Sequence, residues 1–110
     1  MHMKVGEVID RYTIGKLYSE RESQNSDRAD LDCLRHGFHD LVQNHPEVPL
    51  HELEQLMYRI NGFIWDFESP IHTGKMDMDP MMAGVLALRV RKLNVMRTSL
   101  SKIIDQLVGE

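Results

Sequence analysis

Apolar residues recur at intervals of three and four positions along nearly the whole chain, and this spacing is the feature that most constrains its fold. The clearest run follows Pro49 and consists of Leu50, Leu53, Met57, Ile60, Ile64 and Phe67. Such spacing puts the apolar side chains on one face of an α-helix, whereas a half-buried strand needs alternation. No alternating run of Val, Ile, Thr and Tyr competes with it. The chain is therefore predicted to be all-α.

Four helices are predicted, at about residues 4–22, 27–44 and 50–69, and from residue 80 to near Gly109. Pro46 and Pro49 separate the second from the third, because proline lacks an N–H and disfavours helical geometry in the residue before it. Asn25 or Ser26 is the predicted N-cap of the second helix. Residues 69–78 are predicted to form a loop, and Asp79 an N-cap followed by a proline at the first helical position. Residues 1–110 are expected to form one domain, a bundle of about four helices with a long C-terminal helix.

The last helix is unusually long for a chain of 110 residues. Its apolar positions are Met82, Leu86, Leu93, Met96, Leu100, Ile103 and Leu107. A helix of roughly 28 residues is about 42 Å long at 1.5 Å per residue, more than a compact bundle of this size needs. We expect the excess length to pack against a second copy, which predicts a homo-oligomer, a dimer or higher.

Charge and cysteine content exclude several classes of protein. The formal net charge is −4, so no overall positive field favours binding to duplex DNA. The apolar stretches are far too short to span a membrane. Cys33, the single cysteine, has no partner in the chain and lies beside the apolar stripe of the second helix, where a small core residue is expected. A soluble, cytoplasmic protein is predicted.

A line of polar and aromatic residues borders the apolar stripe of the third helix, and a second line borders that of the fourth. The two lines are Glu54, Tyr58, Asn61, Trp65 and Glu68, and Val90, Asn94, Arg97 and Ser101. If these helices pair antiparallel, Asn61 is expected near Asn94, Tyr58 near Arg97 and Trp65 near Val90.

Two interpretations of these lines remain open. The structural one is a buried hydrogen-bond network that sets how the helices align. The functional one is a ligand pocket between the third and fourth helices, in which an aromatic ring stacks, an arginine holds an anion and amides read a base or sugar. The candidate ligand-binding residues are Tyr58, Asn61, Trp65, Glu68, Asn94 and Arg97.

Three segments resemble a group of short helical families of unknown function in bacteria and tailed phages. The segments are Val5 to Ile14, with its Gly-Glu-x-x-Asp start, Ile60 to Glu68, with Asn, Trp and acidic positions, and Arg91 to Arg97, with a Lys-x-Asn-x-x-Arg pattern. The resemblance covers about the first 20 and the last 55 residues. Some members are similar to proteins encoded beside sugar-transfer enzymes, so the resemblance implies sugar-nucleotide biology.

Three functions follow as hypotheses. The first is a non-enzymatic, oligomeric binding protein that holds, and in a phage sequesters, a nucleotide-like or other anionic ligand as a counter-defence. The second is a metal-dependent nucleotide hydrolase, which requires Glu7 and Asp10 to converge with Glu68 or Glu54 around Mg²⁺. The third is a scaffold that binds only protein. No catalytic motif, complete metal site or cofactor motif is found, so we expect no catalytic residue, metal or cofactor.

Overall fold

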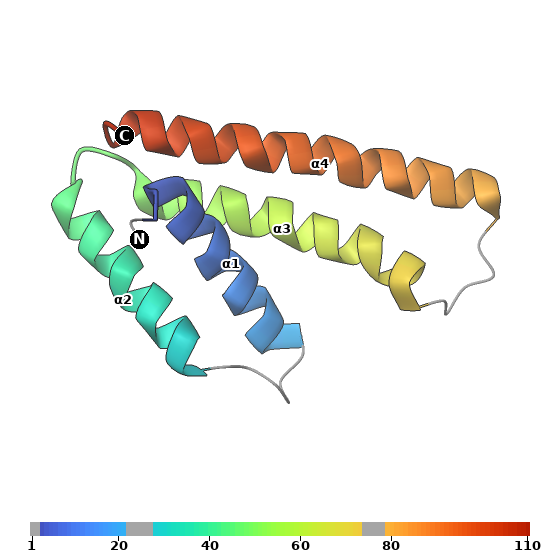
Figure 1. Ribbon diagram of the computed structural model, residues 1–110, viewed down its shortest axis with the longest axis horizontal. Coiled ribbons are helices and arrows are strands. Elements are labelled where there is room, and N and C mark those ends of the chain that lie inside the picture. The colour runs from blue at the N-terminus through green and yellow to red at the C-terminus, as the bar shows by residue number, and fades with distance from the viewer. Residues whose placement is uncertain (1–2, 22–27, 74–78) are drawn as a thin grey trace.

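The described part of the chain forms four helices. The computed structural model describes residues 3–21, 28–73 and 79–110, and within them it contains helices and no strand (Figure 1). The helices are α1 (Val5–Arg21), α2 (Arg28–Asn44), α3 (Leu50–Thr73) and α4 (Pro80–Leu107). The predicted all-α bundle with a long C-terminal helix is confirmed.

The α1 helix is the centre of the assembly. It packs against each of the other three helices, while α2 packs mainly against α1, and α3 pairs with α4. Figure 1 shows α3 and α4 running side by side along the long axis, with α1 against the half of this pair that holds the C-terminus and α2 next to α1, away from α4. The N-terminal half of α4 has only α3 as a neighbour, so the molecule is elongated, at 49 × 31 × 25 Å.

Polar caps hold the ends of the helices as their sequences require. The Asp79 side chain accepts a hydrogen bond of 3.1 Å from the Met81 N–H, which confirms the predicted N-cap of α4. Past the other end of α4, Gly109 has a φ of +84°, a conformation that glycine adopts without strain. At the start of α1, a backbone N–H group is satisfied by a residue distant in the sequence. The Gly6 N–H donates to Asp105 Oδ1 at 2.8 Å.

The end of α3 differs from the prediction. The helix continues through Pro70 to Thr73, although residues 69–78 were expected to form a loop. A proline in a helix removes one backbone hydrogen bond. This loss costs less near the end of a helix, where the last turn has few intrahelical hydrogen bonds, so α3 continues for one turn past Pro70. The predicted N-cap of the second helix, Asn25 or Ser26, lies outside the described residues.

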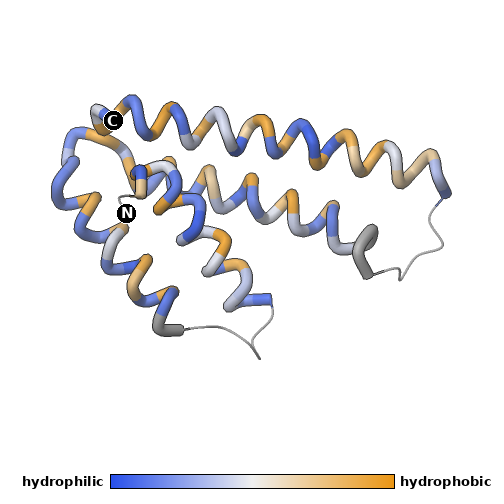
Figure 2. Tube along the Cα trace, viewed as in Figure 1, coloured by the Kyte–Doolittle hydropathy of each residue, from blue (hydrophilic) through white to orange (hydrophobic). Residues whose placement is uncertain are grey.

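The core lies where α1, α3 and the C-terminal half of α4 meet. Its fully buried members are Ile9, Leu17, Leu50, Met57 and Ile104. Four of the seven residues of the predicted α4 stripe are not in this core, because Met82, Met96, Ile103 and Leu107 are exposed. Figure 2 shows apolar residues recurring along the whole of α4, including its N-terminal half. Cys33 is also exposed, so its expected place in the core is wrong.

Candidate functional site

Asn61 links three helices through its side chain. The side chain of this buried residue donates to Asp10 Oδ1 at 2.9 Å and to Thr13 Oγ1 at 2.8 Å, both on α1. On its other side, the Arg97 guanidinium of α4 donates to Asn61 Oδ1 at 3.5 Å, the limit of a hydrogen bond. Asn61 and Arg97 are thus brought together by the fold. Their shared network satisfies groups that would be costly to bury unpaired.

The aromatic candidates of α3 face α1, not α4. The Tyr58 hydroxyl donates a hydrogen bond to the Glu20 carboxylate of α1. Trp65 packs edge to face against Tyr18, with ring centroids 6.0 Å apart and planes at 72°. Tyr58 therefore does not pair with Arg97 as expected, because α1 occupies the space beside α3 that the ligand hypothesis left free.

Glu54 and Glu68 have different environments at the two ends of the same line. Glu54 is buried, and Lys16 of α1 donates to its carboxylate at 2.7 Å. The Lys16 ammonium also lies 5.2 Å from the centre of the Tyr58 ring. Glu68 is half-buried, and its carboxylate forms no hydrogen bond or ion pair with other described residues. Four members of the α3 line, Glu54, Tyr58, Asn61 and Trp65, thus serve to dock α1.

The hydrogen bond to Glu20 changes the acidity of Tyr58. It raises the pKa of the Tyr58 phenol above its ordinary value of 10.0, because the bond favours the protonated hydroxyl. Partial burial and the negative charge of the nearby Glu20 raise this pKa further. The contact between α1 and α3 is therefore strongest while this tyrosine is protonated.

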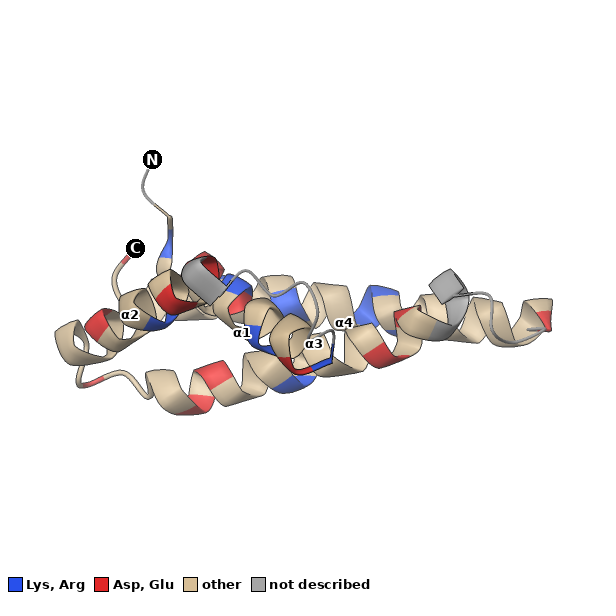
Figure 3. Cartoon of the chain, turned by 90° about the horizontal axis from the view of Figure 1, so that it is seen from below, with Lys and Arg blue, Asp and Glu red and all other residues tan. Residues whose placement is uncertain are grey.

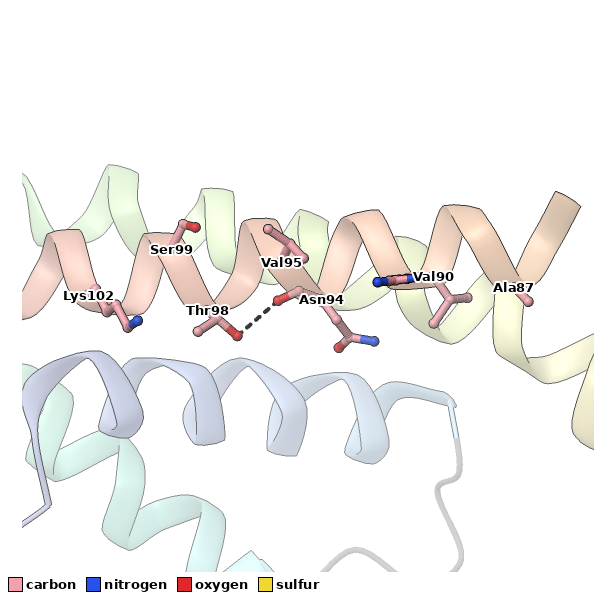
Figure 4. Close-up of a pocket in the computed structure, with 8 residues that line it drawn as sticks. Ala87, Val90, Asn94, Val95, Thr98, Ser99 and Lys102 are labelled. Atoms are coloured by element: carbon pink, nitrogen blue, oxygen red, sulfur yellow. Dashed lines mark hydrogen bonds between the residues drawn. The ribbon is translucent and has the colours of Figure 1, made fainter. Parts of the chain in front are cut away.

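A shallow open groove of about 600 Å³ runs along α4. Its lining residues are Ala87, Val90, Arg91, Asn94, Val95, Thr98, Ser99 and Lys102. Figure 4 shows Asn94, Thr98 and Lys102 projecting from α4 on the side of α1. Of the predicted ligand residues, the groove contains only Asn94. The others that could hold a polar ligand, Arg91, Thr98 and Lys102, were not selected from the sequence, although Arg91 precedes Asn94 and the other two follow it at helical spacing.

The groove belongs to the most basic part of the chain (Figure 3). Residues 80–104 contain five of the 13 Lys and Arg residues and no Asp or Glu, so the remainder has eight basic against 17 acidic residues. Within the described residues, neither Arg91, Arg97 nor Lys102 forms an ion pair with a carboxylate. Cations without carboxylate partners attract anions, and arginine suits phosphate and carboxylate groups in particular.

The carboxylates required for a metal-dependent hydrolase are held apart by other partners. Glu7 pairs with Arg11 at 2.9 Å, Asp10 accepts from Asn61, and Glu54 pairs with Lys16. Among the described residues, no three His, Cys, Asp or Glu side chains are placed to share a metal ion. The geometry therefore gives the hydrolase hypothesis no support.

Comparison with known proteins adds no assignment. No family model, curated protein or solved structure matches the chain. In the part of the chain that the structure describes, no helix combines the length and the apolar character needed to cross a membrane.

Proposed function

We propose that this chain is a non-enzymatic helical protein that binds, and by binding sequesters, a nucleotide-like or other anionic small ligand in the groove of α4. The observation that carries the proposal is the combination, in one groove, of Arg91 and Lys102, which have no carboxylate partner among the described residues, with Asn94 and Thr98 between them. In a phage, such a protein would withdraw a signalling nucleotide from the host. Sequestration needs affinity and no catalytic group.

The spacing of the polar groups suggests the shape of the ligand. Arg91 and Lys102 are 11 residues apart on one helix, which is about 16 Å at 1.5 Å per residue. Two anionic groups, or one extended polyphosphate, suit this separation, since both cationic side chains are long. Asn94 and Thr98 supply hydrogen bonds between the two charges, and Val90 supplies apolar surface for a base or sugar.

This proposal differs from the pocket expected from the sequence. Stacking on Tyr58 or Trp65 is not part of it, because both rings are engaged with α1. Arg97 lies beside the groove and holds Asn61, so its role here is to support the helix crossing. The binding residues are instead taken from α4 alone.

The test is a thermal-shift screen with a panel of ligands. The panel contains mono-, di- and cyclic nucleotides, nucleotide sugars and inorganic phosphate, and native mass spectrometry of the purified protein checks for a retained ligand. We expect at least one nucleotide to raise the melting temperature, because a ligand that binds only the folded state stabilises it. Lys102→Gln is expected to weaken its binding about tenfold or more, since a charge-assisted hydrogen bond contributes roughly 1.5–3 kcal/mol.

Lys92→Gln is the matched control. It removes the same charge from the same helix at an exposed position that does not line the groove. The proposal requires Lys92→Gln to bind as the wild type does. Equal losses in both variants would indicate unspecific attraction to α4, and a panel without any stabilising ligand would contradict the proposal.

A further inference from the structure

The exposed surface of α4 carries most of the large apolar side chains that the fold leaves uncovered. Among the described residues, eight of the 12 exposed large hydrophobic residues are on this helix: Met81, Met82, Val85, Leu88, Val95, Met96, Ile103 and Leu107. We call these eight residues the apolar face of α4. Only Val95 also lines the groove, so the apolar face and the groove are different parts of the helix surface.

The apolar face continues onto α3. Two large apolar residues of α3 are also exposed: Leu56, three residues before Arg59 in the sequence, and Phe63, four residues after it. Phe63 stacks on Phe67 at 6.5 Å, and the Arg89 guanidinium of α4 lies 5.6 Å from the centre of the Phe67 ring. These contacts place the aromatic pair of α3 beside α4. The α3–α4 pair therefore presents one apolar surface built from both helices.

The size of this surface is that of a protein interface. From their exposed fractions, the eight residues of the apolar face present roughly 800 Å² to solvent, about the area that one partner contributes to a stable interface. The largest apolar patch of an ordinary monomer is about 300–600 Å². Three of the eight are methionines, whose flexible side chains adapt to the surface they meet.

The charges of the two helices indicate which partner fits. Of the acidic residues of α3, Glu54 and Asp66 are paired with Lys16 and Arg21 of α1, so Glu52, Glu68 and the basic Arg59 remain, for a net charge of −1. On α4, Arg91 and Lys102 line the groove, Arg97 holds Asn61 and Asp105 accepts from Gly6, so Arg89 and Lys92 remain, for a net charge of +2. A two-fold axis between two copies can place the acidic α3 of each on the basic α4 of the other, whereas α4 on α4 would bring like charges together. An anionic bilayer would attract α4 and repel α3.

We propose that a second copy of this chain covers the apolar face, in a two-fold dimer in which α3 of each copy lies against α4 of the other. The dimer buries the four apolar positions, Met82, Met96, Ile103 and Leu107, whose spacing predicts burial but which one copy leaves exposed. This inference does not depend on ligand binding in the groove.

Sedimentation equilibrium with the full chain tests the dimer. The expected mass is twice the 12.8 kDa of one chain, with dissociation on dilution. Ile103→Glu is expected to give a monomer, because it places a charge within the buried surface, between Met96 and Leu107. Ile14→Glu is the matched control, since Ile14 is an exposed isoleucine of α1, outside the α3–α4 pair, and this variant is expected to remain dimeric.

Three results would overturn the proposal. The first is a wild-type chain that stays monomeric at all concentrations tested. The second is a dimer that persists in both Ile103→Glu and Leu88→Glu, which would place the interface elsewhere. The third is a monomer that co-sediments with vesicles of mixed anionic and zwitterionic lipid, which would assign the apolar face to a membrane surface. Circular dichroism and thermal unfolding of each variant establish that it remains folded.

Discussion

At the scale of single residues, Gly6 sets the distance between α1 and α4. A Cβ atom at this position would lie 2.3 Å from the Ser101 carbonyl oxygen and 2.4 Å from the Ser101 hydroxyl. Only a residue without a side chain allows this approach. The same approach lets the Gly6 N–H reach the Asp105 carboxylate, which satisfies one of the N–H groups left free at a helix start.

Gly6→Ala is expected to lower the free energy of unfolding by about 1–3 kcal/mol, the usual cost of adding a methyl group to a packed contact. Gly37→Ala is the control, because a Cβ at Gly37, within α2, would have no neighbour within 4 Å. Alanine there is expected to stabilise the chain by roughly 0.5–1 kcal/mol through its higher helix propensity. Urea denaturation followed by circular dichroism measures both. Equal stability of the two variants would show that α1 and α4 can separate at little cost.

At the scale of the elements, the polar line on α3 docks α1. Lys16 with Glu54, Glu20 with Tyr58, and Asp10 with Asn61 join the two helices at successive turns of α3. Because each pair needs its own spacing, sliding one helix along the other would break all three. The structural interpretation of this line is therefore the one that the contacts on α3 favour.

The raised pKa of Tyr58 predicts how the contact between α1 and α3 depends on pH. Since the pKa of Tyr58 is higher in the folded chain than in the unfolded chain, its hydroxyl stabilises the fold fully below about pH 10. This stabilisation is lost as the pH rises through the folded-state pKa. Between pH 9 and pH 11, the free energy of unfolding of the wild type is expected to fall more steeply than that of Tyr58→Phe. Parallel curves from urea denaturation would exclude this role for Tyr58.

The element boundaries follow local rules only in part. Asp79 caps the N-terminus of α4, and Gly109 lies just past the C-terminal end of this helix, as capping chemistry requires. Pro70, by contrast, lies inside α3, and so does the Asn61-Gly62 pair, a sequence that favours a hairpin turn. Packing against α1 and α4 on both sides stabilises α3 more than these local preferences oppose it.

At the scale of the whole molecule, the four helices are not equally secured. Whereas α1 has three neighbouring helices, α2 packs mainly against α1, with Phe38 against the Tyr12 ring at a centroid distance of 5.2 Å. Local stability follows the number of buried contacts that an opening must break.

Hydrogen exchange is expected to show α2 opening before the rest of the molecule. Its central amides are predicted to exchange at least about tenfold faster than those of α1, which corresponds to an opening free energy lower by about 1.4 kcal/mol. The comparison is matched in length, because α1 and α2 each contain 17 residues. Exchange resolved by mass spectrometry of peptic fragments measures it. Similar rates in both helices would mean that α1 and α2 open as one unit.

The sequence by itself determined the helical class, the number of helices and most of their ends. Apolar spacing, proline and capping residues act within a few positions of the chain, so they can be read without knowing which helices meet. They also singled out Asn61, Asn94 and Arg97, because polar residues beside an apolar stripe are positioned by the same spacing.

Only the tertiary structure decided what each face of a helix contacts. The spacing places Tyr58 and Trp65 beside the core of α3, but it does not say that α1 covers them. Nor does it show that Met96 and Ile103 stay exposed, because burial depends on how many neighbours surround α4. The physical reason is that helical periodicity is a local property of the backbone, whereas the partner of a face depends on contacts between distant segments, such as Gly6 with Asp105.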